Sequence, residues 1–398
     1  MARSPKALVE ESLLIWARES AGISIEDVAQ CLKVAVDRVH SWESGDSRPS
    51  ISQLRRLSQI YKRPMSVFFL SEPPQDFMPV RDYRHLADRA APEEVSPALR
   101  SEIRRATELR DAAVGLLEDS EEEIAAFPIV ASLASNPDQV ADRIRDDLGI
   151  SLSKQSEWSD AFTAMREWRA AAEGLGVLVI QAARVGLDEM RGFSLTDGPI
   201  GLVCLNANDA PNGRIFTLMH ELAHLAVREG GLCEWERPLQ RSAANESAEA
   251  FCNRVAGAVL VPADALRRSP AVGGASATRA WSNEELKALA SQFSVSREVV
   301  LRRLVIIGLA TQQFYQRKRD EFLEENRSRP KMKAFPVPYQ KRVANSLGHA
   351  FIELVLSSYY ERRITLADAS SLIGVRVKHI PSIEREVIGW SHFRAAGT

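Results

Sequence analysis

Two histidines and a glutamate in the segment His220-Glu221-Leu-Ala-His224 have the types and spacing needed to bind and use a metal ion. Residues four apart in an α-helix lie on one face, so both imidazoles can bind one ion while Glu221 points at a water molecule on it. Zinc suits imidazole ligands, and a catalytic zinc site keeps one position for water. The ion lowers the pKa of that water toward about 7, and a neighbouring carboxylate can pass its proton to a leaving amine. We therefore expect a Zn²⁺ cofactor and peptide hydrolysis, with Glu221 as the general base.

A third protein ligand is needed, and the next helix along the chain offers two acidic candidates, Glu246 and Glu249. These two residues are three apart and share a helix face, so their spacing does not choose between them. The other histidines are remote in sequence from the motif: His40, His85, His349, His379 and His392.

The five-residue motif also occurs by chance on ordinary amphipathic helices, where it has no function. Its surroundings favour a metal site here. The flanking residues are apolar, strands precede the motif, and an acidic helix follows roughly 25 residues later. Two imidazoles and a carboxylate on the buried side of a helix are costly to desolvate without a partner.

The elements that must position these side chains are short strands and longer helices. β-Branched or apolar runs bounded by glycine predict strands over 176–180, 192–195 and 200–205. Apolar periodicity predicts helices over 215–228 and 243–260, the second ending at Pro262. Short strands before long helices predict an α+β domain in a chain that is mostly helical.

The N-terminal residues predict an all-α bundle with the spacing of a helix-turn-helix. In its second helix Val39 and Trp42 should face the core, which leaves Asp37, Arg38, His40 and Ser41 outward as candidate DNA contacts.

The charge of this bundle weakens the expectation of DNA binding. Residues 8–72 carry eight basic and nine acidic side chains, a net charge of −1, which attracts phosphate poorly. The alternative is a domain used for protein contact or for forming a homodimer. The same helix-turn-helix spacing returns at 286–309, where packing beside the metal helices is the favoured role, and again at 364–375.

Several motifs in order resemble the ImmA/IrrE family of metallopeptidases. They are Gly192-Phe-Ser-Leu, Leu205-Asn206, the segment from Arg214 to His224, and the segment from Glu249 to Pro262. The similarity spans about residues 160–310. It implies a small zincin-like α+β domain, Glu249 as the third ligand, and a DNA-binding repressor or immunity protein as the substrate.

The segment 36–49 resembles the Xre/Cro family of helix-turn-helix proteins. One position departs from that family, because Ala35 stands where a capping serine or threonine is usual.

The whole chain of 398 residues is long enough for several domains, with 51 basic and 53 acidic residues and 45% apolar residues. No apolar run reaches the roughly 18 residues of a membrane span, so we expect a cytoplasmic protein without a membrane partner. We expect a helix-turn-helix domain over 7–72, connecting helices over 73–155, the metallopeptidase domain over 156–325 and a C-terminal helical region over 326–398.

The leading hypothesis is a zinc-dependent endopeptidase, fused to a DNA-binding-type module, that cleaves a transcriptional repressor. A metal-binding transcriptional regulator without proteolytic activity and a toxin or antitoxin component are the alternatives.

Overall fold

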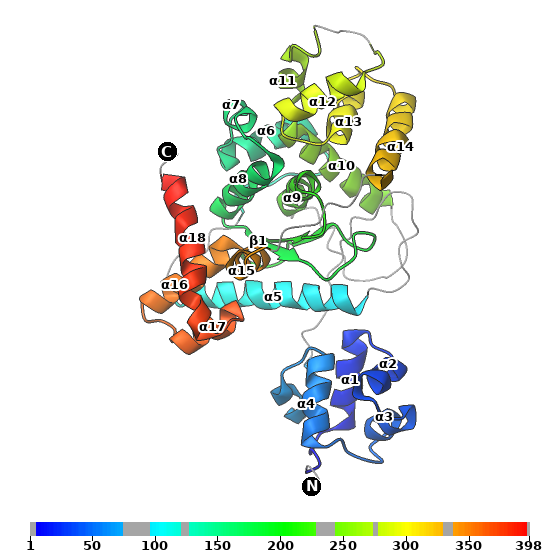
Figure 1. Cartoon of the computed structure of the whole chain (residues 1–398), viewed down its shortest axis with the longest axis vertical. Helices are drawn as coiled ribbons and strands as arrows, with labels where there is room; N and C mark the ends of the chain where they lie inside the picture. The colour runs from blue at the N-terminus through cyan, green and yellow to red at the C-terminus, as the bar shows by residue number, and fades with distance from the viewer. Residues whose placement is uncertain are drawn as a thin grey trace. The chain divides into compact units, whose positions relative to one another are not determined.

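The computed structural model describes residues 5–74, 96–120, 127–227, 243–273, 278–328 and 337–395 (Figure 1). These residues form two compact units. The first contains the helices up to residue 70 and the first part of α5 (Pro97–Glu118), and the second contains the rest of α5 and the residues that follow. No helix in these ranges is both long and apolar enough to cross a bilayer.

The first unit is all-helical, as predicted. Its elements are α1 (Glu11–Ala21), α2 (Ile25–Leu32), α3 (Val36–Glu43), α4 (Ile51–Ile60) and η1 (Met65–Phe69). Local capping sets these boundaries: the Ser24 hydroxyl accepts a hydrogen bond from the Asp27 N–H, and Ser50 forms a capping box with Gln53. The Trp42 side chain, 2% exposed, lies in the core of this unit.

The second unit contains a three-stranded sheet, which confirms the α+β prediction for the centre of the chain. The strands are β1 (Leu178–Ala182), β2 (Gly192–Leu195) and β3 (Leu202–Asn206), in the order β1-β3-β2. β1 runs parallel to β3 and β2 antiparallel to it, with Ser194 opposite Val203. All three strands are buried, and for this reason their sequences consist almost entirely of apolar residues.

Helices surround the sheet. α8 (Ala161–Gly174), α9 (Pro211–Ala226) and α10 (Ala243–Leu260) form the central layer, in which α9 packs on β2 and β3 and against both other helices. The remaining helices of this part are α6 (Pro137–Leu148), α7 (Leu152–Ser156), α11 (Ala263–Arg268), α12 (Asn283–Gln292), α13 (Arg297–Ile306) and α14 (Gln312–Ser328). α13 packs against α10, as expected for the helices over 286–309.

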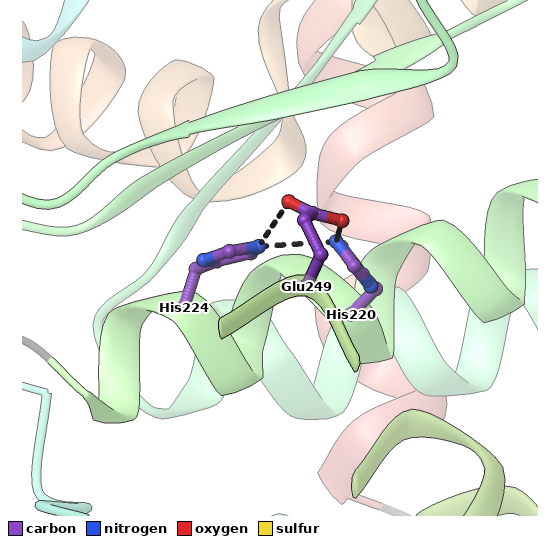
Figure 2. Close-up of side chains that lie close together, drawn as sticks. All are labelled: His220, His224 and Glu249. Atoms are coloured by element: carbon purple, nitrogen blue, oxygen red, sulfur yellow. Dashed lines mark hydrogen bonds and ion pairs between the residues drawn. The ribbon is translucent and has the colours of Figure 1, made fainter. Parts of the chain in front are cut away.

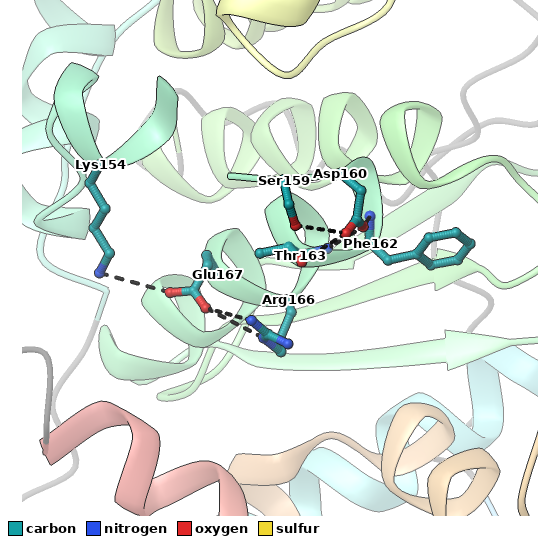
Figure 3. Close-up of polar contacts among 7 residues, drawn as sticks. All are labelled: Lys154, Ser159, Asp160, Phe162, Thr163, Arg166 and Glu167. Atoms are coloured by element: carbon teal, nitrogen blue, oxygen red, sulfur yellow. Dashed lines mark hydrogen bonds and ion pairs between the residues drawn. The ribbon is translucent and has the colours of Figure 1, made fainter. Parts of the chain in front are cut away.

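Side-chain hydrogen bonds to its first backbone N–H groups fix where α8 begins (Figure 3). The Asp160 carboxylate accepts hydrogen bonds from the N–H of Phe162 at 2.8 Å and of Thr163 at 3.0 Å. These backbone hydrogen bonds lower the pKa of Asp160. One turn further on, Glu167 pairs with Lys154 and Arg166.

The C-terminal helices belong to the second unit. They are α15 (Tyr339–Leu347), α16 (His349–Tyr360), α17 (Leu366–Ile373), η3 (Val377–His379) and α18 (Ile380–Ala395). α15 and α16 pack on β1. A buried ion pair between Arg169 Nε and Glu173 Oε1, 3.1 Å apart, ties them to α8, because Arg169 also donates to the carbonyl of Ala344 and Glu173 accepts the N–H of His349. Gly348 lies against this pair at φ 91°, a conformation that favours glycine.

Candidate metal centre

The histidines of the predicted motif lie on α9, and the helix is buried along most of its length. It begins with Pro211 at its first position, where the missing N–H of proline has no cost. The His220 and Glu221 side chains are only 1% and 2% exposed. His224 lies one turn after His220, so both imidazoles point from the same face of α9 (Figure 2).

Glu249 reaches this face from α10. Its Oε2 lies 3.4 Å from His220 Nε2 and its Oε1 lies 3.3 Å from His224 Nε2, while the two Nε2 atoms are 3.0 Å apart. Four ligands arranged tetrahedrally at about 2.0 to 2.1 Å from a zinc ion lie about 3.3 to 3.4 Å from one another. The distances from the two imidazole nitrogens to the nearer carboxylate oxygen of Glu249 are close to this spacing, and one ligand atom from each residue lies within 4.8 Å of the others, which fits a zinc ion. The side chain of Glu246, the other acidic candidate, lies outside the described residues.

The charge state of Glu249 also suits a ligand. Burial raises the pKa of its carboxyl, but hydrogen bonds and charge from His220 and His224 outweigh burial and hold the pKa well below its usual range. Its side chain is 33% exposed, against 1% for His220, so the site opens on the α10 side. A carboxylate that stays ionised at neutral pH is ready to bind a cation.

Glu221, the expected base, is held by a residue that the sequence did not single out. Ser194 on β2 donates its hydroxyl proton to Glu221 Oε2 at 2.8 Å, and both side chains are buried. In the sequence Ser194 shows itself only as a polar residue inside an apolar strand and as part of the Gly192-Phe-Ser-Leu motif. A buried charge-assisted hydrogen bond of this kind fixes the orientation of the carboxylate.

Gly192 lets β2 come close enough to α9 for this bond to form. A Cβ atom at this position would lie 2.4 Å from Thr217 Cγ2 and 2.9 Å from the Cys204 carbonyl oxygen, so any side chain forces the strand and helix apart. The same position lies 3.7 Å from Glu221 Oε1. The backbone of Gly192 thus forms part of the surroundings of the expected base.

The candidate DNA contacts lie on α3 in the first unit. Asp37, Arg38 and His40 are exposed, and Val39 is buried as expected. Ser41 is half-buried, and its hydroxyl donates to the Arg38 carbonyl at 2.9 Å. Three of the four predicted side chains are therefore open to a partner, while the fourth is already used within the domain.

Two family models match separate parts of the chain. Residues 172–305 match the Peptidase_M78 family model, described as an IrrE N-terminal-like domain. Residues 14–68 match a helix-turn-helix family model. No curated protein matches the chain. The two matches give the chain the architecture of a helix-turn-helix domain followed by an ImmA/IrrE-type domain.

Proposed function

We propose that the protein is a zinc-dependent endopeptidase in which His220, His224 and Glu249 hold the ion and Glu221 is the general base. The observation that carries this proposal is the convergence of three ligand atoms, all within 4.8 Å of one another, from two different helices. A bound zinc ion supplies Lewis-acid chemistry, which makes water more acidic and polarises a peptide carbonyl.

The residues of the chain supply the proton transfers. Glu221 accepts a proton from the attacking water and donates it to the leaving amine, which a carboxylate beside the cleaved bond can do at neutral pH. The Ser194 hydroxyl donates to Oε2 of Glu221 and so helps to hold the carboxylate in one orientation. The low exposure of Glu221, 2%, limits competing bulk water.

The substrate that we propose is a regulatory protein bound to DNA, such as a transcriptional repressor. A helix-turn-helix domain on the same chain supports this proposal, because it can bring the peptidase to the same DNA and raise the local concentration of the substrate. Asp37, Arg38, His40 and Ser41 are the proposed contacts with DNA. Arg38→Ala should weaken the retardation of a DNA duplex in a mobility-shift assay.

The central test is Glu221→Gln, assayed on a peptide library by mass spectrometry together with metal analysis. We expect this variant to keep its zinc and to lose cleavage by about 1,000-fold or more, because the amide cannot accept the proton. Glu284→Gln, a change at an exposed glutamate on α12, is the matched control and should cleave normally. Undiminished cleavage by Glu221→Gln would rule out the proposed base, and a purified protein that binds no zinc would rule out the metal site.

A further inference from the structure

Two segments far apart in the chain share the backbone of a helix-turn-helix. Residues 24–43 form the predicted one, and residues 365–384 repeat its geometry. Both first helices, α2 and α17, have eight residues. Both begin at a hydroxyl that accepts the N–H of an aspartate three residues later, from Asp27 to Ser24 and from Asp368 to Thr365.

The turns also agree residue by residue. α2 is followed by Lys33 at φ 58° and α17 by Gly374 at φ 68°, both left-handed. The next residue in each turn is a valine, whose N–H donates to a carbonyl five residues earlier at 3.0 Å. The residue after that is extended in both segments, Ala35 at φ −67°, ψ 148° and Arg376 at φ −70°, ψ 143°. A helical segment then begins at Val36 and at Val377.

The buried residues occupy equivalent positions in the two segments. All of them are at most 5% exposed: Val28, Leu32, Val39 and Trp42 in the first segment, and Ala369, Ile373, Ile380 and Ile383 in the second. In the second segment η3 and α18 together take the place of α3, and α17 packs against η3.

The turn alone does not make a DNA-binding surface, as a third example shows. Between α12 and α13, Ser294 is left-handed at φ 50° and Ser296 is extended. Counting from the left-handed residue, however, Val299 and Leu301 stand where α3 has Arg38 and His40, and they are 8% and 0% exposed. α13 packs against α10 and α14, so the face that would enter a groove is inside the protein.

In the C-terminal segment the corresponding face is basic and mostly exposed, and His379, at the position of Arg38, is half-buried. Arg376, Lys378 and Pro381 are exposed, and Val377 is 45% exposed. Arg376 takes the position of Ala35, and Lys378 takes the position of Asp37. These two exchanges add three units of positive charge relative to α3, and His379 at the position of Arg38 takes one away, so the face is more positive than that of α3 by two charges when histidine is counted as neutral.

Neighbouring side chains extend the basic face. The Tyr339 ring at the start of α15 lies 5.1 Å from the His379 ring, and the Arg342 guanidinium lies 5.8 Å from the centre of the Tyr339 ring. The acidic residues of the segment are engaged elsewhere or partly covered: Asp368 binds the Thr365 hydroxyl, Glu384 accepts the Tyr360 hydroxyl, and Glu386 is half-buried. These carboxylates keep their charge, but among the described residues none of them forms an ion pair with Arg376 or Lys378.

We propose that residues 365–385 are a second DNA-binding helix-turn-helix, in which Arg376 and Lys378 contact phosphates of a DNA duplex. The exposed start of the second helix, η3 with the first turn of α18, enters the major groove. A B-form duplex fits because its major groove admits an α-helix, whereas that of double-stranded RNA is too narrow. This site is independent of the metal centre and of the contacts proposed on α3.

The test uses the full chain and a duplex of about 30 base pairs of mixed sequence, titrated at several salt concentrations. We expect Arg376→Ala/Lys378→Ala to weaken binding by about tenfold or more near 0.1 M salt. The slope of log affinity against log salt should fall by about two, because two phosphate contacts are lost. Arg267→Ala/Arg268→Ala, which removes two exposed cations from α11, is the matched control and should bind like the original protein.

A second variant changes one side chain and alters the charge by two units. Lys378→Asp places in the C-terminal segment the residue type that α3 has at the equivalent position, and it should weaken binding at least as much as the double variant. Circular dichroism checks that each variant remains folded. The proposal is overturned if the original protein fails to retard the duplex at low salt, if both variants bind as it does, or if the control weakens binding equally. Arg38→Ala reports on α3 separately.

Discussion

The metal centre and the face of α3 place their polar groups in opposite surroundings. His220 and Glu221 are almost fully buried, whereas Asp37, Arg38 and His40 are exposed. Interactions between buried charges are strong, and a group that loses its partner there has no water to replace it. Exposed charges are screened by salt and solvated by water. We therefore expect single changes at the metal centre to act nearly all-or-none, and changes on α3 to act in small, salt-dependent steps.

The largest effect should come from removing a ligand. Glu249→Ala takes away one of three converging side chains, and we expect zinc affinity to fall by about 1,000-fold or more, beyond the 10- to 100-fold that is typical of losing an outer partner of a ligand. Metal analysis after dialysis against a chelator measures this loss. Glu246→Ala is the control that separates the two acidic candidates of α10, and loss of zinc from that variant alone would reassign the third ligand.

A buried group away from the metal centre should also have a large effect. Burial, together with the nearby charge of Arg169, lowers the pKa of His349 to about 3. The folded protein therefore keeps this imidazole neutral while the unfolded chain binds a proton near pH 6.5, so stability falls as the pH drops from about 6.5 toward 3. The loss is about 1.4 kcal/mol per pH unit, or about 3 kcal/mol by pH 4.

Denaturant unfolding of the full chain at several pH values measures this slope. His349→Gln should flatten it over the same range. His379→Gln, a change at a less buried histidine in the same C-terminal region, should leave the slope in place. An unchanged slope in His349→Gln would show that acid instability arises from other groups.

A smaller effect is expected when the orientation of the base is disturbed but the base remains. Ser194→Ala removes the hydrogen bond to the Glu221 carboxylate, and a bond to a charged group contributes about 1.5 to 3 kcal/mol. We expect cleavage to fall by about 10- to 100-fold with zinc content unchanged. Ser194→Thr retains the hydroxyl and should recover part of the activity. Loss of zinc in Ser194→Ala would instead show that β2 supports the ligands.

The smallest effect should come from the exposed face of α3. Asp37→Lys gives α3 the residue type that stands at the equivalent position of the C-terminal segment, and we expect duplex binding to strengthen by only a few fold, with a steeper salt dependence. Glu72→Lys makes the same change of charge at an exposed site of the same domain, away from the helix-turn-helix segment at residues 24–43, and should change binding less. A change in affinity as large as the effect of Glu249→Ala would contradict the contrast between buried and exposed sites.

Much of the local structure could be predicted from sequence neighbours. The helix that carries His220 and His224, the three strands, and the inward placement of Val39 and Trp42 all follow from apolar periodicity, caps and turn residues. These signals depend on contacts between residues that are close in the chain, which are present before any tertiary packing.

The partners of these residues were decided by packing. Spacing left Glu246 and Glu249 equivalent, and only the way α10 lies on α9 brings Glu249 to the two imidazoles. Ser194 and Glu221 are 27 residues apart, and their hydrogen bond depends on the close approach of strand and helix at Gly192.

The segment around Gly374 combines both cases. The sequence determined by itself that a turn forms there, because its backbone pattern is local. Whether the helix after such a turn is buried, as α13 is, or exposed, as η3 and the start of α18 are, was decided by which distant helices cover it.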